Sequence, residues 1–135
     1  EDLAANPARC TLAYWHHARF TSGLHGADAT VDQLWKVLDE GGADVVLAGH
    51  DHHYERFAPQ AAGGVADPDG IRQFVVGTGG RSLYPMIGRT ANSEAGTSST
   101  FGVLKLTLRE QGYEWRFLPT KGKFRDEGTA ACTES

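Results

Sequence analysis

The sequence has little cysteine, no basic run and no long apolar run, and each shortage argues against a class of protein. The two cysteines, Cys10 and Cys132, lie outside any CxxC pair, so a zinc site built from thiolates is not expected. No apolar stretch approaches the ~20 residues that span a bilayer, and the formal net charge of -4 does not favour nucleic acid. We therefore expect neither a membrane nor a nucleic-acid partner. The 135 residues, 40% of them hydrophobic, are enough for one domain with a core.

The two cysteines leave two interpretations open. They are either unrelated buried thiols or a disulfide that ties the glycine-rich tail to the first strand. We take the Cys10–Cys132 disulfide as the prediction, because the tail needs an anchor. It would imply an oxidising compartment, and hence a secreted or periplasmic protein.

Apolar patterning predicts an α/β fold with a mixed sheet. Apolar residues at helical spacing predict a helix over 31–40, begun by a capping box of Thr30 and Gln33. A long irregular surface loop is expected over 81–100. Short apolar or alternating runs predict strands over 10–15, 43–49, 71–76, 101–108 and 113–118. The last two strands should form a C-terminal hairpin in which Leu104, Leu106 and Leu108 share a face with Tyr113, Trp115 and Phe117.

The first residues, EDLAANP, are typical of the last turn of a helix stopped by Pro7. A domain rarely starts with the end of a helix. We therefore expect the chain to begin inside a larger domain.

All six histidines lie before residue 54, and most of them follow predicted strands. His16 and His17 come after the first strand, and His50, His52 and His53 come after the second. Ligands bind beyond the carboxyl ends of strands in open α/β sheets, and histidine is the commonest metal ligand. If the second strand stays extended, His50 and His52 project to one side and His53 points away. His16 and His17 are neighbours, so at most one of them should join the same centre.

Two motifs then carry a family resemblance. Trp15-His16-His17-Ala18, and the run from Gly49 to Arg56 (GHDHHYER) with GTGG after it, resemble two metal-ligand blocks of the calcineurin-like metallophosphoesterases, in particular the purple acid phosphatase-like enzymes. The second block matches throughout, whereas Ala18 replaces the usual proline of the first. The resemblance implies that residues 1–135 are the C-terminal portion of a metallophosphoesterase catalytic domain, part of a layered α/β/β/α sandwich.

The resemblance also implies roles for single residues. His16 and His50 would bind one metal ion and His52 a second, the two ions being divalent or of mixed valence (iron, zinc or manganese). His25 would act as the catalytic histidine beside the leaving group of a phosphate ester. The residues expected to support the ligands or contact substrate are His17, His53, Tyr54, Glu55 and Arg56.

Several blocks of that family are missing from the chain. These blocks supply aspartates, one of which bridges the two metals, and an asparagine. A bridging carboxylate offsets the charge of two cations about 3.5–4 Å apart. The missing N-terminal half of the domain is therefore an expected partner. The chain alone should bind one metal ion or none and hydrolyse esters poorly.

Three alternatives remain open. A cupin would place HxH and Glu55 in a closed barrel, although the 31–40 helix fits a barrel badly. A mononuclear zinc site of His16, His50 and His52 would make a self-sufficient hydrolase or lyase. A processed fragment that binds metal weakly would contribute structure only. For the glycines at 77–80 we expect a tight turn with positive φ rather than an anion cradle.

Overall fold

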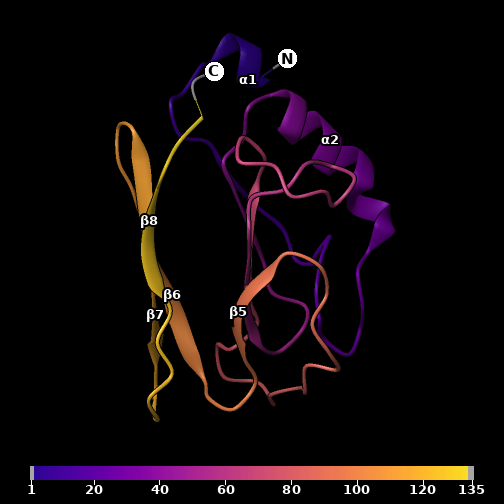
Figure 1. The fold of residues 1–135 in the computed structure, drawn as a ribbon, viewed down its shortest axis with the longest axis vertical. Coiled ribbons are helices and arrows are strands. Elements are labelled where there is room, and N and C mark those ends of the chain that lie inside the picture. Colours follow the sequence, from indigo (N-terminus) through magenta and orange to yellow (C-terminus); the bar gives the residue numbers. More distant parts are fainter. Residues whose placement is uncertain (1, 134–135) are drawn as a thin grey trace.

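A computed structural model describes residues 2–133 as two sheets with helices at one side (Figure 1). The elements in chain order are α1 (Asp2–Ala5), β1 (Leu12–Tyr14), a 3-10 turn (Ala29–Val31), α2 (Asp32–Glu40), β2 (Val45–Ala48), β3 (Tyr54–Phe57), β4 (Arg72–Val76), β5 (Ser93–Thr97), β6 (Gly102–Leu108), β7 (Gly112–Pro119) and β8 (Glu127–Ala131). None of the described helices is long and apolar enough to cross a membrane.

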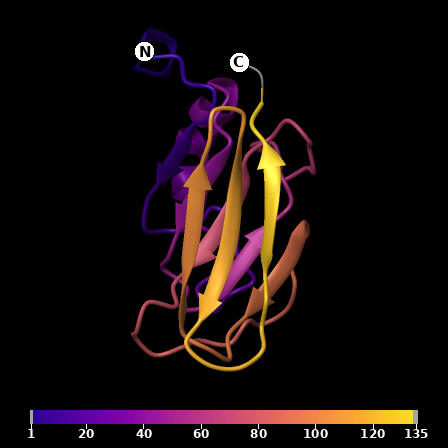
Figure 2. The same ribbon diagram turned by 90° about the vertical axis from the view of Figure 1, so that its left-hand side faces the viewer.

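The first sheet is mixed and has the strand order β1-β2-β4-β3-β5. Strands β1, β2 and β4 run parallel, and β3 runs antiparallel to both of its neighbours. The second sheet, β6-β7-β8, is antiparallel throughout, and Figure 2 shows its three strands in front of the first sheet. Both sheets are open, so the cupin interpretation, which needs a closed barrel, is wrong.

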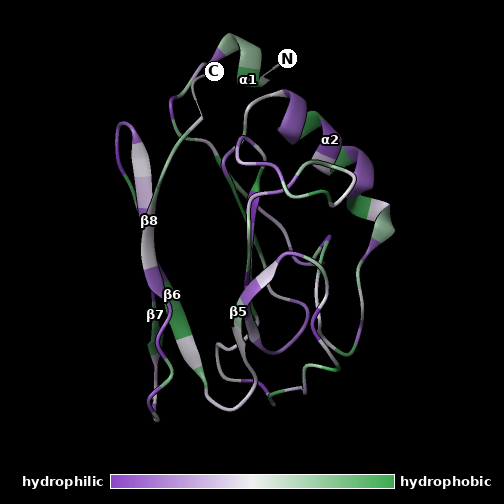
Figure 3. Ribbon diagram, in the orientation of Figure 1, coloured by the Kyte–Doolittle hydropathy of each residue, from purple (hydrophilic) through white to green (hydrophobic). Residues whose placement is uncertain are grey.

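The fold has three layers, α2, the first sheet and the second sheet, because successive side chains of β2 point to opposite faces of the first sheet. Val45 faces the second sheet and packs with Phe74 and Trp115, whereas Val46 faces α2 and packs with Trp35. A strand covered on both faces needs apolar residues at every position, which explains the continuous run VVLA. Along α2, apolar residues alternate with polar ones, and Trp35 and Leu38 are buried (Figure 3). The predicted mixed α/β sandwich is confirmed.

The start of α2 differs from the prediction. Thr30 does not cap the helix: the residue before α2 is Val31, which makes no side-chain capping bond. Asp28 instead caps the 3-10 turn by accepting a hydrogen bond from the Thr30 N–H at 2.8 Å. The capping box was wrong because the chain enters the helix through this extra turn, which moves the cap two residues upstream.

Three strands were not predicted, namely β3, β5 and β8. The long loop expected over 81–100 contains β5, and the glycine-rich tail, for which no element was predicted, contains β8. The hairpin itself is confirmed, with Leu104 opposite Phe117, Leu106 opposite Trp115 and Leu108 opposite Tyr113. β8 then pairs with β7 and extends the hairpin to three strands.

The predicted disulfide is present and closes the end of the molecule at which both termini lie. Cys10 and Cys132 are bonded, with their Cα atoms 5.4 Å apart. Beside the disulfide, the buried Asp44 carboxylate accepts hydrogen bonds from the backbone N–H groups of Thr11 and Thr133, each at 2.7 Å. α1 lies at this same end, and its helical turn before Pro7 agrees with the sequence prediction.

Candidate metal centre

The loops that carry the histidines are joined by backbone hydrogen bonds just beyond β1 and β2. The His16 carbonyl accepts from the Gly49 N–H at 3.0 Å and from the His50 N–H at 2.9 Å. Pairing of the two parallel strands therefore continues for two residues past their ends. This continuation brings residues 34 positions apart in the sequence side by side.

Three histidines meet at this point. Ligand nitrogens of His16, His17 and His50 all lie within 4.8 Å of one another. His16 Nε2 and His50 Nδ1 are 3.0 Å apart, and the His17 and His50 ring centroids are 4.3 Å apart. His16 and His17 are exposed and His50 is half-buried. We call these three residues the histidine cluster.

His25 borders the histidine cluster. Its ring centroid is 4.5 Å from that of His50 and 5.3 Å from that of Tyr84. Burial, and then the charges that His17, His25 and His16 carry when protonated, lower the pKa of His50 below its usual value. A lowered pKa favours the neutral imidazole, which is the form that binds a metal ion.

His52 lies outside the cluster, contrary to the expected convergence with His50. Its Nδ1 is 2.6 Å from the Ser82 carbonyl oxygen, to which it donates, and its ring stacks on Tyr84 with centroids 4.1 Å apart. The prediction assumed an extended chain, but β2 ends at Ala48 and the chain then bends, with the His53 N–H bonded to the Asp51 carbonyl at 2.9 Å. His17, to which the sequence motifs assigned no metal ion, lies beside His50, and the expected role of His52 at a second metal ion stays a prediction.

Asp51 organises the bend, and sequence analysis missed this. The side chain is buried, and its carboxylate accepts from the Thr21 hydroxyl at 2.7 Å and from the His25 backbone N–H at 3.0 Å. A Cβ at Gly23 would lie 2.3 Å from this carboxylate, so only glycine fits there. The position of Asp51 between two histidines is the feature of the sequence that could have indicated this role.

His53 and Glu55 form a buried pair behind the bend. His53 Nε2 lies 3.0 Å from Glu55 Oε2, and Glu55 also accepts from the Ser22 N–H at 2.8 Å and from the Ser93 hydroxyl at 2.6 Å. Burial opposes ionisation of Glu55, but the hydrogen bonds from His53, Ser22 and Ser93 outweigh it and lower the pKa of Glu55. Glu55 thus ties the 21–23 loop to β3 and β5.

Tyr54 and Arg56 point away from the histidine cluster and bind Asp126 instead. The Tyr54 hydroxyl donates to Asp126 at 2.6 Å, and Arg56 donates through Nε at 2.9 Å and Nη2 at 3.0 Å. Burial and then the hydrogen bond to Asp126 raise the pKa of Tyr54. Asp126 precedes β8, so these bonds join the first sheet to the second.

The glycines at 77–80 serve two purposes. Gly80 has a φ of 134°, in agreement with the expected turn. Gly77 has no positive φ, but a Cβ there would lie 1.9 Å from the Asp51 carbonyl oxygen and 2.4 Å from that of Gly49. The buried Thr78 hydroxyl donates to the Gly102 carbonyl at 2.8 Å and is not free to hold an anion. Gly77 therefore leaves room for the bend that carries the histidines.

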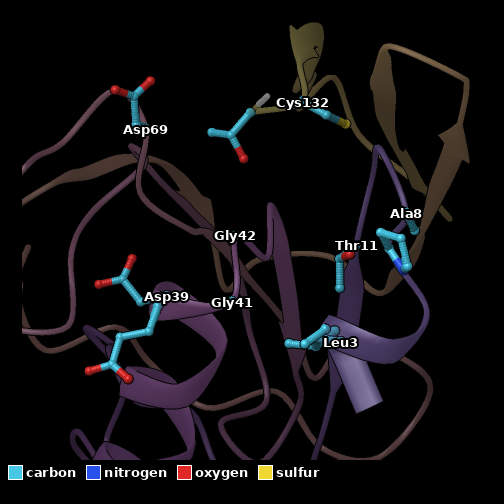
Figure 4. A pocket seen from close by; sticks show the side chains of 12 residues that line it. Leu3, Ala8, Thr11, Asp39, Gly41, Gly42, Asp69 and Cys132 are labelled. Carbon is cyan, nitrogen blue, oxygen red and sulfur yellow. The ribbon is translucent and has the colours of Figure 1, made fainter. Parts of the chain in front are cut away.

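Two cavities lie at opposite ends of the first sheet. A small one of about 280 Å³ is lined by His17, His25 and His50. A larger one of about 890 Å³ lies between α1 and the end of α2 (Figure 4). It is bordered by Thr11 and Gly42, which precede β1 and β2, so it sits at the amino ends of these strands. We place the candidate site at the smaller cavity, because the ligand-type side chains converge there.

The donor set of the histidine cluster fits one divalent cation. Three imidazoles that leave a position open are a common zinc ligand set. A second cation would need carboxylates, and the nearby Asp51 carboxylate is buried and already bonded to Thr21 and His25. Cys10, Asp44 and Cys132 also lie together, but the two sulfurs are bonded to each other and cannot bind a metal.

The layered fold is similar to that of two solved structures, one of which is a purple acid phosphatase. No family model and no curated protein sequence matches the chain. Among solved structures, purple acid phosphatase PPD1 from seeds of yellow lupin (Lupinus luteus) is similar over 96% of this chain and 26% of its own, with 22% identity and a TM-score of 0.79.

A second solved structure shares the fold. GAP50, the anchor in the inner membrane complex of Plasmodium, is similar over 98% of this chain and 40% of its own, with 18% identity and a TM-score of 0.80. The chain thus spans between a quarter and two-fifths of the length of these proteins. One is named as an enzyme and the other as an anchor, so the likeness establishes the fold alone.

Proposed function

We propose that this chain is the histidine-bearing part of a metal-dependent phosphoesterase of the acid phosphatase type. The observation that carries the proposal is the convergence of His16, His17 and His50 at the carboxyl ends of β1 and β2, in a fold shared with a purple acid phosphatase. Ligands bind at this edge of α/β sheets, which supports a role for the histidines in binding a metal ion.

The reaction proposed is hydrolysis of a phosphate ester. The histidines would hold a divalent cation, which would supply polarisation of the phosphoryl group. The oxygen of a water molecule would form a bond to phosphorus and lose a proton to solvent, the ester P–O bond would break, and the leaving oxygen would take a proton. His25 is the residue proposed to deliver this proton, since its ring lies 4.5 Å from that of His50 at the mouth of the small cavity. His52, held through Nδ1 by the Ser82 carbonyl, keeps Nε2 free for a second cation.

The complete site is proposed to need carboxylates from elsewhere. Neutral imidazoles do not offset the charge of two neighbouring cations, which repel one another without a bridging carboxylate. The N-terminal half of the domain is the proposed source. The chain alone is then expected to be inactive or nearly so. The disulfide supports the proposal of a secreted or periplasmic protein.

Hydrolysis of a chromogenic phosphate ester, with zinc, manganese and iron supplied in turn, tests the proposal. The chain alone should show little turnover, and co-expression with the N-terminal half of the domain encoded by the same gene should raise turnover sharply. His50→Ala should abolish the increase, because His50 belongs to the histidine cluster. Rapid turnover by the chain alone, unchanged in His50→Ala, would contradict the proposal.

A further inference from the structure

We propose that the first metal ion binds to His16, His17 and His50, with His17 as a third ligand that the sequence motifs do not imply and Asp28 as the residue that orients His17. This inference rests on the metal-dependent function proposed above and narrows it to one set of donors. It departs from the ligand set that the sequence motifs imply, in which His16 and His50 bind one ion, His52 binds the other and His17 binds neither.

The first support is the spacing of the nitrogens. Two nitrogens bound to one zinc ion at ~2.0–2.1 Å in tetrahedral geometry lie about 3.3 Å apart. His16 Nε2 and His50 Nδ1 are 3.0 Å apart, close to this separation. A ligand nitrogen of His17 lies within 4.8 Å of both, so a small movement of exposed rings brings all three onto one ion.

The second support is the partner of His17. Its Nδ1 lies 3.4 Å from Asp28 Oδ2, while the other oxygen of Asp28 is held by the N–H and hydroxyl of Thr30. A carboxylate that accepts from one ring nitrogen of a histidine leaves the other nitrogen free to bind metal and increases its basicity. Asp28 is itself fixed, because it caps the 3-10 turn before α2.

The third support is the position of His52. Its ring is stacked on Tyr84, and its Nδ1 is bonded to the Ser82 carbonyl on a different loop. His52 is not among the three residues whose ligand nitrogens lie within 4.8 Å of one another, whereas His17 is and lies on the same loop as His16.

Zinc titration of the chain against a chromogenic chelator tests the assignment, with cobalt absorption as a report of coordination geometry. The expected result is one zinc ion per chain and intense visible bands from four-coordinate cobalt. His17→Ala should weaken zinc binding at least roughly tenfold, and His52→Ala by less than about twofold. Asp28→Asn, which keeps the cap because asparagine also caps helices, should weaken binding roughly 10–100-fold, as loss of an orienting carboxylate does.

Other outcomes overturn the assignment. These are no zinc binding, equal effects of His17→Ala and His52→Ala, or a loss of affinity in His52→Ala alone. Thermal unfolding without metal checks that His17→Ala and Asp28→Asn are folded, and both residues lie at the surface. Because zinc affinity is measured without substrate, a chain that binds zinc through His17 but never yields an active enzyme would retain this inference and refute the proposed function alone.

Discussion

The Asp51 carboxylate holds the backbone of His25 from 26 positions away in the sequence, by accepting its N–H at 3.0 Å. The other carboxylate oxygen accepts from the Thr21 hydroxyl at 2.7 Å. One buried side chain therefore fixes the loop that carries His25 against the bend that carries His50. The position of His25 relative to the histidine cluster depends on this residue.

Replacing Asp51 should loosen this loop. Asp51→Ala leaves two buried donors without an acceptor, and we expect the free energy of unfolding to fall by about 2–4 kcal/mol, since each unmet donor costs about 1–3 kcal/mol. Asp51→Asn keeps an acceptor for the His25 N–H and should lose less. Urea unfolding measures both changes, and hydrogen exchange should accelerate at the His25 amide in Asp51→Ala. An unchanged exchange rate there would show that Asp51 does not hold the loop.

The bidentate bond between Arg56 and Asp126 should be a main connection between the two sheets. Asp126→Ala removes the acceptor of the buried Tyr54 hydroxyl and of Arg56, which is only 13% exposed and keeps Glu94 as an ion-pair partner, and we expect a loss of about 2–4 kcal/mol. The pair of Arg116 and Glu127 is the matched control, because these side chains are 61% and 53% exposed. Glu127→Gln should cost less than about 1 kcal/mol. Equal losses in urea unfolding would contradict the connecting role of Asp126.

The backbone of residues 49–51 lies so close to Gly77 that a substitution there tests whether the bend is rigid. Gly77→Ala places a methyl group 1.9 Å from the Asp51 carbonyl oxygen, and the backbone must move to accept it. We expect a loss of more than about 3 kcal/mol, at or beyond the upper end of overpacking costs. Gly79→Ala is the control, since a Cβ there meets nothing within 4 Å. Thermal unfolding should separate the two variants widely, and similar midpoints would mean that the bend can shift freely.

The buried Glu55 should make stability depend on acid pH. Its pKa is lower in the folded chain than in the unfolded chain, so the unfolded chain takes up the proton first as the pH falls. The contribution of Glu55 is then fully present above the unfolded pKa of about 4.3 and is lost as the pH falls through the folded pKa.

Glu55→Gln isolates this contribution. At pH 7 the variant should be less stable than the parent by about 2–3 kcal/mol, because charge-assisted hydrogen bonds from Ser22, Ser93 and His53 weaken. The difference should shrink as the pH falls below about 4, where the glutamate loses its charge. Urea unfolding at a series of pH values measures this, and a difference that is constant from pH 7 to pH 3 would contradict the role given to Glu55.

The strands found from the sequence are those whose apolar pattern matches their burial. β2 is apolar throughout and is buried on both faces, whereas β6 and β7 alternate and form one face of the core. β3 was missed because its buried positions include Tyr54 and Glu55, whose polar groups bond to partners far away in the sequence such as Asp126 and Ser22. β8 was missed because its small residues carry no apolar signal, although Gly128 has to be small to lie against the Trp115 ring.

The location of the candidate site could also be predicted from the sequence, but which histidines lie together there could not. Strand ends place His16 and His50 together, and the structure brings them together. Whether His17 or His52 joins them depends on the path of the chain after Ala48. That path is set by Asp51 and by a segment far from it in the sequence, which contains Gly77 and Ser82. Neither the alternation of apolar and polar residues nor a sequence motif predicts such contacts.

The disulfide between Cys10 and Cys132 gives the molecule two functionally different poles. The disulfide and the Asp44 carboxylate lie at the amino ends of β1 and β2, and the histidine cluster lies at the carboxyl ends of the same strands. The Cys10–Cys132 bond, which joins positions 122 apart in the sequence, therefore fixes the amino ends of these strands to the second sheet and leaves their carboxyl ends, where His16 and His17 are exposed, outside this clamp.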